Sequence, residues 1–570
     1  MHTQRERLGG EVIIDYLDSS TAASIDADLC IIGAGAAGIA MARRFIGTPI
    51  TVCVIEGGGA LGEEQSQALY EGLSIGTLPL DAGTSRMRVF GGSCNLWGGG
   101  CIPLGAHDLA ERDWVPHSGW PIRYDELRTY YERARDYCQI NAYDFADGSF
   151  LAPLARSPIP FDANKLVNYI FARSPILFGK AYRTELENAP NITVVLHANL
   201  LELHASADGD SVRHARIGAI DGRKGVVRAQ HYVLACGGIE NARLLLLSDS
   251  ILPRGLGNQH DLVGRYFMDH PCGSLGTVLT DTPERLTRPY DRNAGKGVTP
   301  ASPEIGLSHA FQQAHRILNG RVHPFAVEEA VPPGIRSLRD FRAALRPAVQ
   351  DENAVLEARL CAALKNGPSS DEGTRERSTN LAKLALRVGL GSADIARAFV
   401  HKLRDKPTVR SNRVELIGYF EQAPNRDSRI TLADQRDILG LRKVCVDWRL
   451  AALDRHTYRT AATLFGAELA RACGGTYQPA AWLSDNDDIP AQVHTTAHHL
   501  GTTRMSDDPR QGVVDRHCRV HGIDNLHVAG SSVFPTGGWA FPTFTVVALG
   551  LRLADRLYAS MRTAALSEAV

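Results

Sequence analysis

The stretch that decides the fold is ADLCIIGAGAAGIAMARRFIGTPITVCVIE, from Ala27 to Glu56. Its apolar run LCII stops at glycines, a helix-like run AAGIAMARRFI follows, and a second apolar run, ITVCVIE, ends on Glu56. A strand, a glycine turn, a helix and a second strand in this order predict one βαβ unit.

The glycines of this turn have the spacing GxGxxG, with Gly33, Gly35 and Gly38 in GAGAAG. After a strand and at the opening of a helix, such glycines permit a tight turn, close approach of a diphosphate and close helix packing. The anion then rests on backbone N–H groups at the helix N-terminus. Glu56 stands where a carboxylate accepts a hydrogen bond from a ribose hydroxyl. The stretch therefore predicts a dinucleotide site rather than an ordinary tight turn.

Two further passages have the same strand-then-helix character, from His231 to Ser248 and from Asn525 to Leu557. Three separated α/β pieces in a chain of 570 residues indicate one discontinuous domain with large insertions. The intervening stretches, roughly Ala106 to Lys180 and Asp291 to Ile489, are expected to cover a substrate. The second of these contains a helix-like passage from Pro333 to Thr408.

Composition narrows the class of protein further. Lysine and arginine number 62 against 63 acidic residues, a formal charge of −1, so the whole-chain charge favours neither nucleic acid nor an anionic membrane as a partner. No apolar run is long enough to span a membrane, and residues 1–20 lack the apolar stretch of a secretory signal, so we expect a cytoplasmic protein. The eleven cysteines form no CxxC pair, which favours reduced core thiols, and we predict no metal site.

Four stretches resemble the glucose-methanol-choline (GMC) oxidoreductase family, and WVPHSGWPI (Trp114 to Ile122) is similar to its bacterial members. The four stretches are RVFGGSCNLWGGG (Arg88 to Gly100), ACGGIENARLLLLS (Ala235 to Ser248), HHLGTTRM (His498 to Met505, continuing to Gly538) and PTFTVVALGLRLAD (Pro542 to Asp555). The resemblance implies an α/β fold: a discontinuous Rossmann-like FAD-binding domain with an inserted α+β substrate-binding domain. In numbers, residues 1–105, 181–290 and 490–570 would belong to the first, and 106–180 and 291–489 to the second.

The resemblance also implies FAD as cofactor. The residues that it places at FAD are Gly33, Gly35, Ala36, Gly38, Glu56, Gly91, Gly92, Ser93, Asn95, Leu96, Trp97, Gly98, Gly530, Pro542 and Thr543. Flavin-linked relatives carry a histidine before the tryptophan of the glycine-rich stretch. Leu96 stands there in this chain and has no nucleophile, so we expect non-covalent FAD.

The same resemblance places His498 at the family's catalytic histidine. Hydride loss from an alcohol needs its hydroxyl proton removed, and imidazole suits that task. His499 and His494 are alternatives to this base. Pro542 suits a first helical position, where the helix dipole would favour an anionic flavin; an ordinary helix that closes the domain is the simpler interpretation.

Phe541 departs from the family, which has asparagine or histidine as the polar partner of the base. Either His499 or Trp539 replaces that partner, or His498 works alone. The phenylalanine ring would then wall the pocket and favour a substrate with an apolar or aromatic face.

We therefore expect oxidation of the CH–OH group of a small alcohol, most simply a sugar, glycoside or polyol, with an electron acceptor that stays open. A non-redox or inactive FAD-binding relative, such as a lyase, is the alternative because the partner at Phe541 is missing. An NADPH-dependent flavin monooxygenase would need a second GxGxxG, and ACGGIEN is not one.

Overall fold

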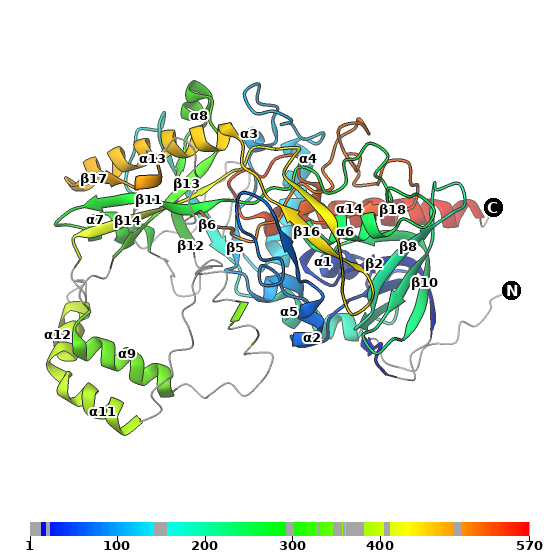
Figure 1. Cartoon of the computed structure of the whole chain (residues 1–570), viewed down its shortest axis with the longest axis horizontal. Coiled ribbons are helices and arrows are strands. Elements are labelled where there is room, and N and C mark those ends of the chain that lie inside the picture. The colour runs from blue at the N-terminus through cyan, green and yellow to red at the C-terminus, as the bar shows by residue number, and fades with distance from the viewer. Residues whose placement is uncertain are drawn as a thin grey trace.

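The computed structural model describes residues 13–18, 23–140, 157–291, 301–327, 331–345, 356, 359–360, 381–403, 411–483 and 493–568. Two large sheets organise these residues (Figure 1), one mainly parallel and one antiparallel. The expected α/β fold with an inserted α+β region is confirmed.

The first sheet carries the predicted βαβ unit. Its strands, in spatial order, are β1 (Ile13–Asp15), β7 (Ile192–Leu196), β3 (Val52–Ile55), β2 (Ser24–Ile32), β10 (Lys224–Leu234), β9 (Val212–Gly218) and β8 (Asn199–Ala205), with β18 (Leu526–Val528) paired to β10. Strands β1, β7, β3, β2, β10 and β18 pair in parallel, whereas β9 pairs antiparallel with both β10 and β8. All four residues of β3 are buried, as expected where helices cover both faces of a parallel sheet.

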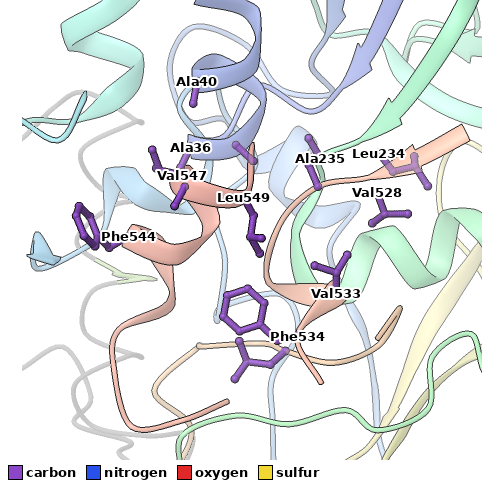
Figure 2. Packing of buried hydrophobic residues seen from close by; sticks show 14 of the residues in the cluster. Ala36, Ala40, Leu234, Ala235, Val528, Val533, Phe534, Phe544, Val547 and Leu549 are labelled. Atoms are coloured by element: carbon purple, nitrogen blue, oxygen red, sulfur yellow. The ribbon is translucent and has the colours of Figure 1, made fainter. Parts of the chain in front are cut away.

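Helices α1 (Ala36–Arg44) and α14 (Pro542–Glu568) pack against each other beside this sheet. Figure 2 shows Ala36 of α1 close to Val547 of α14, with Phe544 nearby. The small side chains of α1 allow this close approach, and Gly38 lets the helix start pack on the glycine turn, because a Cβ there would lie 2.0 Å from the Gly33 carbonyl oxygen. The helix predicted to begin at Pro542 does so.

The second sheet is antiparallel and has seven strands. In spatial order they are β17 (Thr476–Pro479), β11 (Cys272–Leu279), β14 (Arg413–Phe420), β13 (Gly320–Ala326), β12 (Ala301–Leu307), β6 (Leu166–Arg173) and β5 (Gly100–Cys101). Helix α13 (Ala452–Cys473) lies across it (Figure 1). A third, small sheet contains β15 (Arg429–Arg436), β16 (Arg442–Asp447) and β4 (Gly72–Ser74).

Two elements bear on the predicted domain boundaries, which stay a prediction. Strand β11 belongs to the antiparallel sheet although residues 181–290 were assigned to FAD binding. Helix α4 (Tyr124–Tyr137), assigned to the substrate side, packs on α14. Sheet membership thus favours a boundary before Cys272 rather than at 290.

The remaining helices complete the fold. They are α2 (Glu64–Ala68), α3 (Ala106–Leu109), α5 (Phe178–Glu187), α6 (Gly237–Leu247), α7 (Glu284–Thr287), α8 (His309–His315), α9 (Pro333–Leu345), α11 (Leu381–Leu390) and α12 (Ser392–Leu403). The last three fall in the predicted helix-like passage, and most of its other residues lie outside the described part. Over the described ranges, no helix has the length and apolarity to cross a membrane. Ten cysteines are free thiols, and the eleventh, Cys361, lies outside the described residues.

Candidate active site

A cavity of about 440 Å³ takes its lining from the parallel sheet, from the loop before α14 and from the β15–β16 hairpin. Residues of the glycine turn and residues around His498 line the same cavity, although they stand more than four hundred positions apart in the chain. The chain therefore brings the predicted nucleotide-binding and catalytic segments together in one space.

The glycine turn forms one part of this cavity. Gly33 has a φ of 103°, and a Cβ there would lie 2.7 Å from the Ala235 carbonyl oxygen, so both the conformation and the space require glycine. A Cβ added to Gly35 would have no other atom within 4 Å, so the backbone there is open to a ligand. A Cβ on Gly92 would lie 3.0 Å from the Gly35 Cα, so the two predicted glycine-rich stretches are in contact.

Glu56 follows β3, is 7% exposed and lines the cavity. Its Oε2 accepts a hydrogen bond from the Ala34 N–H at 2.9 Å and its Oε1 from the Gly58 N–H at 3.0 Å. Burial raises the pKa of Glu56, and these backbone donors limit the rise. Each carboxylate oxygen keeps a second acceptor site, so Glu56 both holds the turn and can accept a bond from a ligand hydroxyl.

Most residues predicted at the cofactor line the cavity. They are Gly33, Gly35, Ala36, Glu56, Gly92, Ser93, Leu96, Trp97, Gly98, Gly530, Pro542 and Thr543. Gly38, Gly91 and Asn95 do not line it. Gly38 packs the helix on the turn, and the Asn95 amide donates to the Phe90 carbonyl at 3.1 Å, so these residues shape the backbone around the cavity.

A buried row of charges, which the sequence analysis missed, also lines the cavity. Glu240 pairs with Arg86 at 3.0 Å and with Arg243 at 3.2 Å, and Arg243 pairs with Asp437 of the β15–β16 hairpin at 2.8 Å. Burial opposes the charge of Glu240, but Arg243 and Arg86 outweigh it and lower the pKa of Glu240 to about 2. Pairing of this kind is what permits buried charges. No local sequence pattern predicts this row of charges, because Arg86 and Arg243 pair with residues 154 and 194 positions away in the chain.

His498 occupies the other part of the cavity. Its Nδ1 lies 2.9 Å from Nδ1 of His270 and 3.0 Å from the Thr496 hydroxyl oxygen, and its backbone N–H donates to Asp269 at 3.0 Å. His270 was missed by the sequence analysis, since 228 positions separate it from His498 and a lone histidine before a proline carries no signal of its own.

The hydrogen bonds of His270 determine which ring nitrogen of His498 carries a proton. His270 Nε2 lies 2.9 Å from the Gly538 carbonyl oxygen, which can only accept, so this nitrogen carries the hydrogen. Burial lowers the pKa of His270 to about 4, and Arg321 acts in the same direction, so the ring is neutral at pH 7 and its Nδ1 is bare. The hydrogen between the two rings therefore belongs to His498 Nδ1, which leaves a lone pair on His498 Nε2.

No described residue forms a hydrogen bond with that Nε2 lone pair. Burial, with smaller contributions from His270 and Arg321, holds the pKa of His498 well below its usual value. The ring is therefore neutral at pH 7 and can accept a proton.

His499 lines the cavity too, but its surroundings differ. Its Nε2 is buried without a hydrogen-bond partner among the described residues, and its ring lies 5.8 Å from that of Phe267. Burial, helped by Arg86, lowers the pKa of His499 to about 3. His494, the third histidine considered, does not line the cavity and instead pairs its backbone with Cys272.

Phe541 lines the cavity beside His498, with ring centroids 5.8 Å apart and planes at 86°. The Arg321 guanidinium lies 4.6 Å from its ring centroid, and a Cβ on Gly100 would lie 2.6 Å from the ring, so the ring is tightly held. Trp539, a candidate to replace the polar partner missing at Phe541, stacks on Tyr169 with ring centroids 3.9 Å apart and does not line the cavity. Polar side chains that do line the cavity include Thr496 and Arg173, whose guanidinium donates to the Gly98 carbonyl at 2.9 Å.

The chain is similar to several known proteins. Residues 424–550 match the family model described as GMC oxidoreductase. The 6'''-hydroxyparomomycin C oxidase of Streptomyces lividus is 24% identical over 586 residues, which span 92% of this chain and 90% of that protein. The fructose dehydrogenase large subunit of Gluconobacter japonicus is 25% identical over 334 residues, which span 58% of this chain and 47% of that protein, about half its length.

Solved structures show the same fold. Pyridoxine 4-oxidase from Mesorbium loti superposes with a TM-score of 0.54 at 17% identity, covering 94% of this chain and 99% of that chain. Formate oxidase gives a TM-score of 0.53 at 16% identity, covering 95% and 100%.

Fold, family match and relatives together define an oxidoreductase built on a dinucleotide-binding sheet. The family match over residues 424–550, the relatives and the fold together support membership of the GMC oxidoreductase family. FAD is the cofactor that this membership implies.

The cavity fits FAD. It offers the backbone N–H groups at the start of α1 and Glu56 as an acceptor. It also has two glycine stretches, at Gly35 and Gly92, that touch each other and have no side chains to keep a ligand away. Phosphates suit the α1 start, and a flat ring system suits the glycine-rich stretch from Gly92 to Gly98, next to Pro542 and Thr543.

Proposed function

We propose that this protein oxidises the CH–OH group of a small alcohol, with His498 as the base. The observation that carries the proposal is the geometry of His498: its Nδ1 is bonded to His270, its Nε2 has no hydrogen-bond partner among the described residues, and it lies in the cavity that the dinucleotide turn also lines. Bound FAD supplies the acceptor for the hydride that leaves the carbon. The final electron acceptor stays open.

The chain's own residues account for the proton. His498 Nε2 takes the hydroxyl proton, while His498 Nδ1–H stays bonded to His270 and fixes the ring orientation. The low pKa of His498 makes it a weak base in the resting state. Arg173, which lines the cavity, favours a negative substrate oxygen over a neutral one, which lowers the cost of deprotonation.

A sugar, glycoside or polyol is the substrate class we propose. The relatives named above are a 6'''-hydroxyparomomycin C oxidase and the large subunit of a fructose dehydrogenase. The Phe541 ring gives the cavity an apolar wall beside the base, so we further propose a preference for substrates with an apolar or aromatic face, such as aryl glycosides.

Anaerobic mixing tests the proposal. The FAD-loaded protein is mixed without oxygen with a panel of free sugars, aryl glycosides and polyols, and loss of the oxidised flavin absorption band is followed. At least one member of the panel is expected to bleach the band. If dithionite bleaches the flavin and no alcohol does, the protein is instead a non-redox FAD-binding relative, the alternative that the missing polar partner at Phe541 leaves in place.

Acid precipitation tests how FAD is held. We propose non-covalent binding because Leu96 offers no nucleophile beside Trp97. Intact FAD is expected in the supernatant; flavin that stays in the pellet would show a covalent link elsewhere.

A further inference from the structure

The helices α9, α11 and α12 form a unit, here called the helical arm, that lies apart from the two large sheets (Figure 1). Gly334 of α9 and Gly391 between α11 and α12 make backbone contact, since a Cβ on Gly334 would lie 2.2 Å from the Gly391 carbonyl oxygen. The Gly334 N–H also donates to Asp394 at 3.1 Å. The arm is therefore a packed unit rather than three separate helices.

The arm exposes large apolar side chains. Leu386 and Leu390 of α11 are 64% and 80% exposed, and Phe399 of α12 is 62% exposed. Leu386 and Leu390 are four positions apart, so they share one face of α11. Water-exposed apolar groups on one helix face are unfavourable unless another surface covers them.

Charge indicates which surface that is. The three helices of the arm contain seven lysines and arginines and two aspartates, in a chain whose total formal charge is −1. The even whole-chain balance thus conceals a local positive excess. Lys383 and Arg387 lie on α11 beside the Leu386–Leu390 face, at helical spacing from it.

A second copy of this chain is a poor occupant, because pairing two arms would bring two positive clusters together. A membrane-spanning role is excluded by length, since α11 has 10 residues and α12 has 12. Apolar side chains flanked by basic ones are instead typical of helices that lie in the interface of an anionic bilayer.

We propose that the helical arm docks on the surface of a membrane that contains anionic lipid. Leu386, Leu390 and Phe399 enter the interface, and the basic side chains of the arm meet the lipid headgroups. This inference does not depend on the proposed enzymatic function.

Vesicle sedimentation tests the docking. FAD-loaded full-length protein is spun with vesicles of phosphatidylcholine alone or with about one third phosphatidylglycerol. Binding is expected to be at least about tenfold stronger with the anionic lipid and to weaken in high salt. The triple variant Leu386→Ser, Leu390→Ser, Phe399→Ser is expected to lose at least about tenfold in binding, because three apolar anchors are removed.

The matched control is Leu61→Ser with Ile75→Ser, two side chains that are 59% and 63% exposed outside the arm. These should leave binding unchanged, and circular dichroism checks that every variant folds. Equal sedimentation of the native protein and the triple variant would overturn the proposal. So would a native dimer that the triple variant converts to a monomer without any lipid, because that result would make the arm an interface between copies.

Discussion

The two parts of the cavity are built in different ways. The part formed by the glycine turn comes from one short stretch, Gly33 to Glu56, and acts through backbone groups and one carboxylate that is bonded to neighbouring N–H groups. The part around His498 joins segments from four regions of the chain, carrying Arg173, His270, His498 and Phe541.

This difference has a chemical consequence. Backbone N–H groups are present whatever the side chains are, so the glycine turn needs only the right conformation. A base needs the correct tautomer and an open lone pair, and here the hydrogen bond that His498 donates to His270, a residue far away in the sequence, determines both. Substitutions should therefore affect cofactor retention at the first part and the rate of flavin reduction at the second.

His498→Ala should give the largest effect. Anaerobic flavin reduction by the best substrate is expected to slow by about 10² to 10⁴, because the general base is lost, while FAD stays bound. Stopped-flow absorbance measures the rate and the flavin spectrum measures retention.

His499→Ala is the control for this substitution, and it should cost far less because the Nε2 of His499 is buried. A large loss in the His499 variant with a near-native His498 variant would assign the base to the neighbouring residue.

Glu56→Gln should weaken FAD binding and leave the rate of the loaded enzyme nearly unchanged. One charge-assisted hydrogen bond is worth about 1.5–3 kcal/mol, or about a ten- to hundredfold change in Kd. Glutamine keeps a carbonyl acceptor for only one of the two backbone N–H groups that Glu56 binds, so part of the loss is expected to come from the turn itself. Fluorescence of released FAD gives the Kd; an unchanged value would move the ribose contact to another residue.

His270 should act as a positioning residue, and a pair of variants distinguishes this role from simple packing. His270→Ala is expected to slow flavin reduction about tenfold, since the hydrogen bond that fixes the His498 tautomer is lost. His270→Gln should recover most of the rate, because its amide can accept from His498 Nδ1–H and donate to the Gly538 carbonyl. Equal loss in both variants, with equal losses of thermal stability, would reduce His270 to a packing role.

The rate of flavin reduction by the native protein should stay constant to a lower pH than it would with a histidine of ordinary pKa as the base. The base works when neutral, and burial lowers the pKa of His498 in the folded protein, so protonation begins only below pH 6.5. The rate of flavin reduction is expected to stay constant from pH 7.5 through pH 6.5 and to fall only at lower pH, by about tenfold per pH unit. An acid limb centred at or above pH 6.5 would contradict this assignment.

Phe541→Asn should give the smallest effect. The amide would offer the substrate oxygen one hydrogen bond, worth about 1 kcal/mol, or roughly fivefold in rate. Preference should shift from aryl glycosides towards free sugars, since the apolar wall is removed. Rates of flavin reduction on both substrate classes measure the shift, and the ring serves only to fill space if the native protein prefers free sugars and the variant behaves identically.

Much of the fold could be predicted from local patterns. The βαβ unit from Ala27 to Glu56 and the helix that begins at Pro542 were predicted correctly, because strand and helix periodicity and the conformational limits of glycine and proline act over a few residues. Sheet membership was harder: nothing local to Cys272–Leu279 states that this strand joins the antiparallel sheet, since its partners lie elsewhere in the chain.

The candidate site divides in the same way. The glycine turn, Glu56 and the segment HHLGTTRM could be named from the sequence, and Gly33, Gly35, Glu56, His498 and His499 line the cavity. The bond between His270 and His498 and the buried row from Arg86 to Asp437 could not, since each depends on residues that meet only after folding. The helix-like passage from Pro333 to Thr408 was predicted, but not that its helices lie apart from the two large sheets with apolar side chains exposed. Local sequence restricts backbone conformation, whereas protonation, charge pairing and exposure depend on distant neighbours, which the folded chain alone brings together.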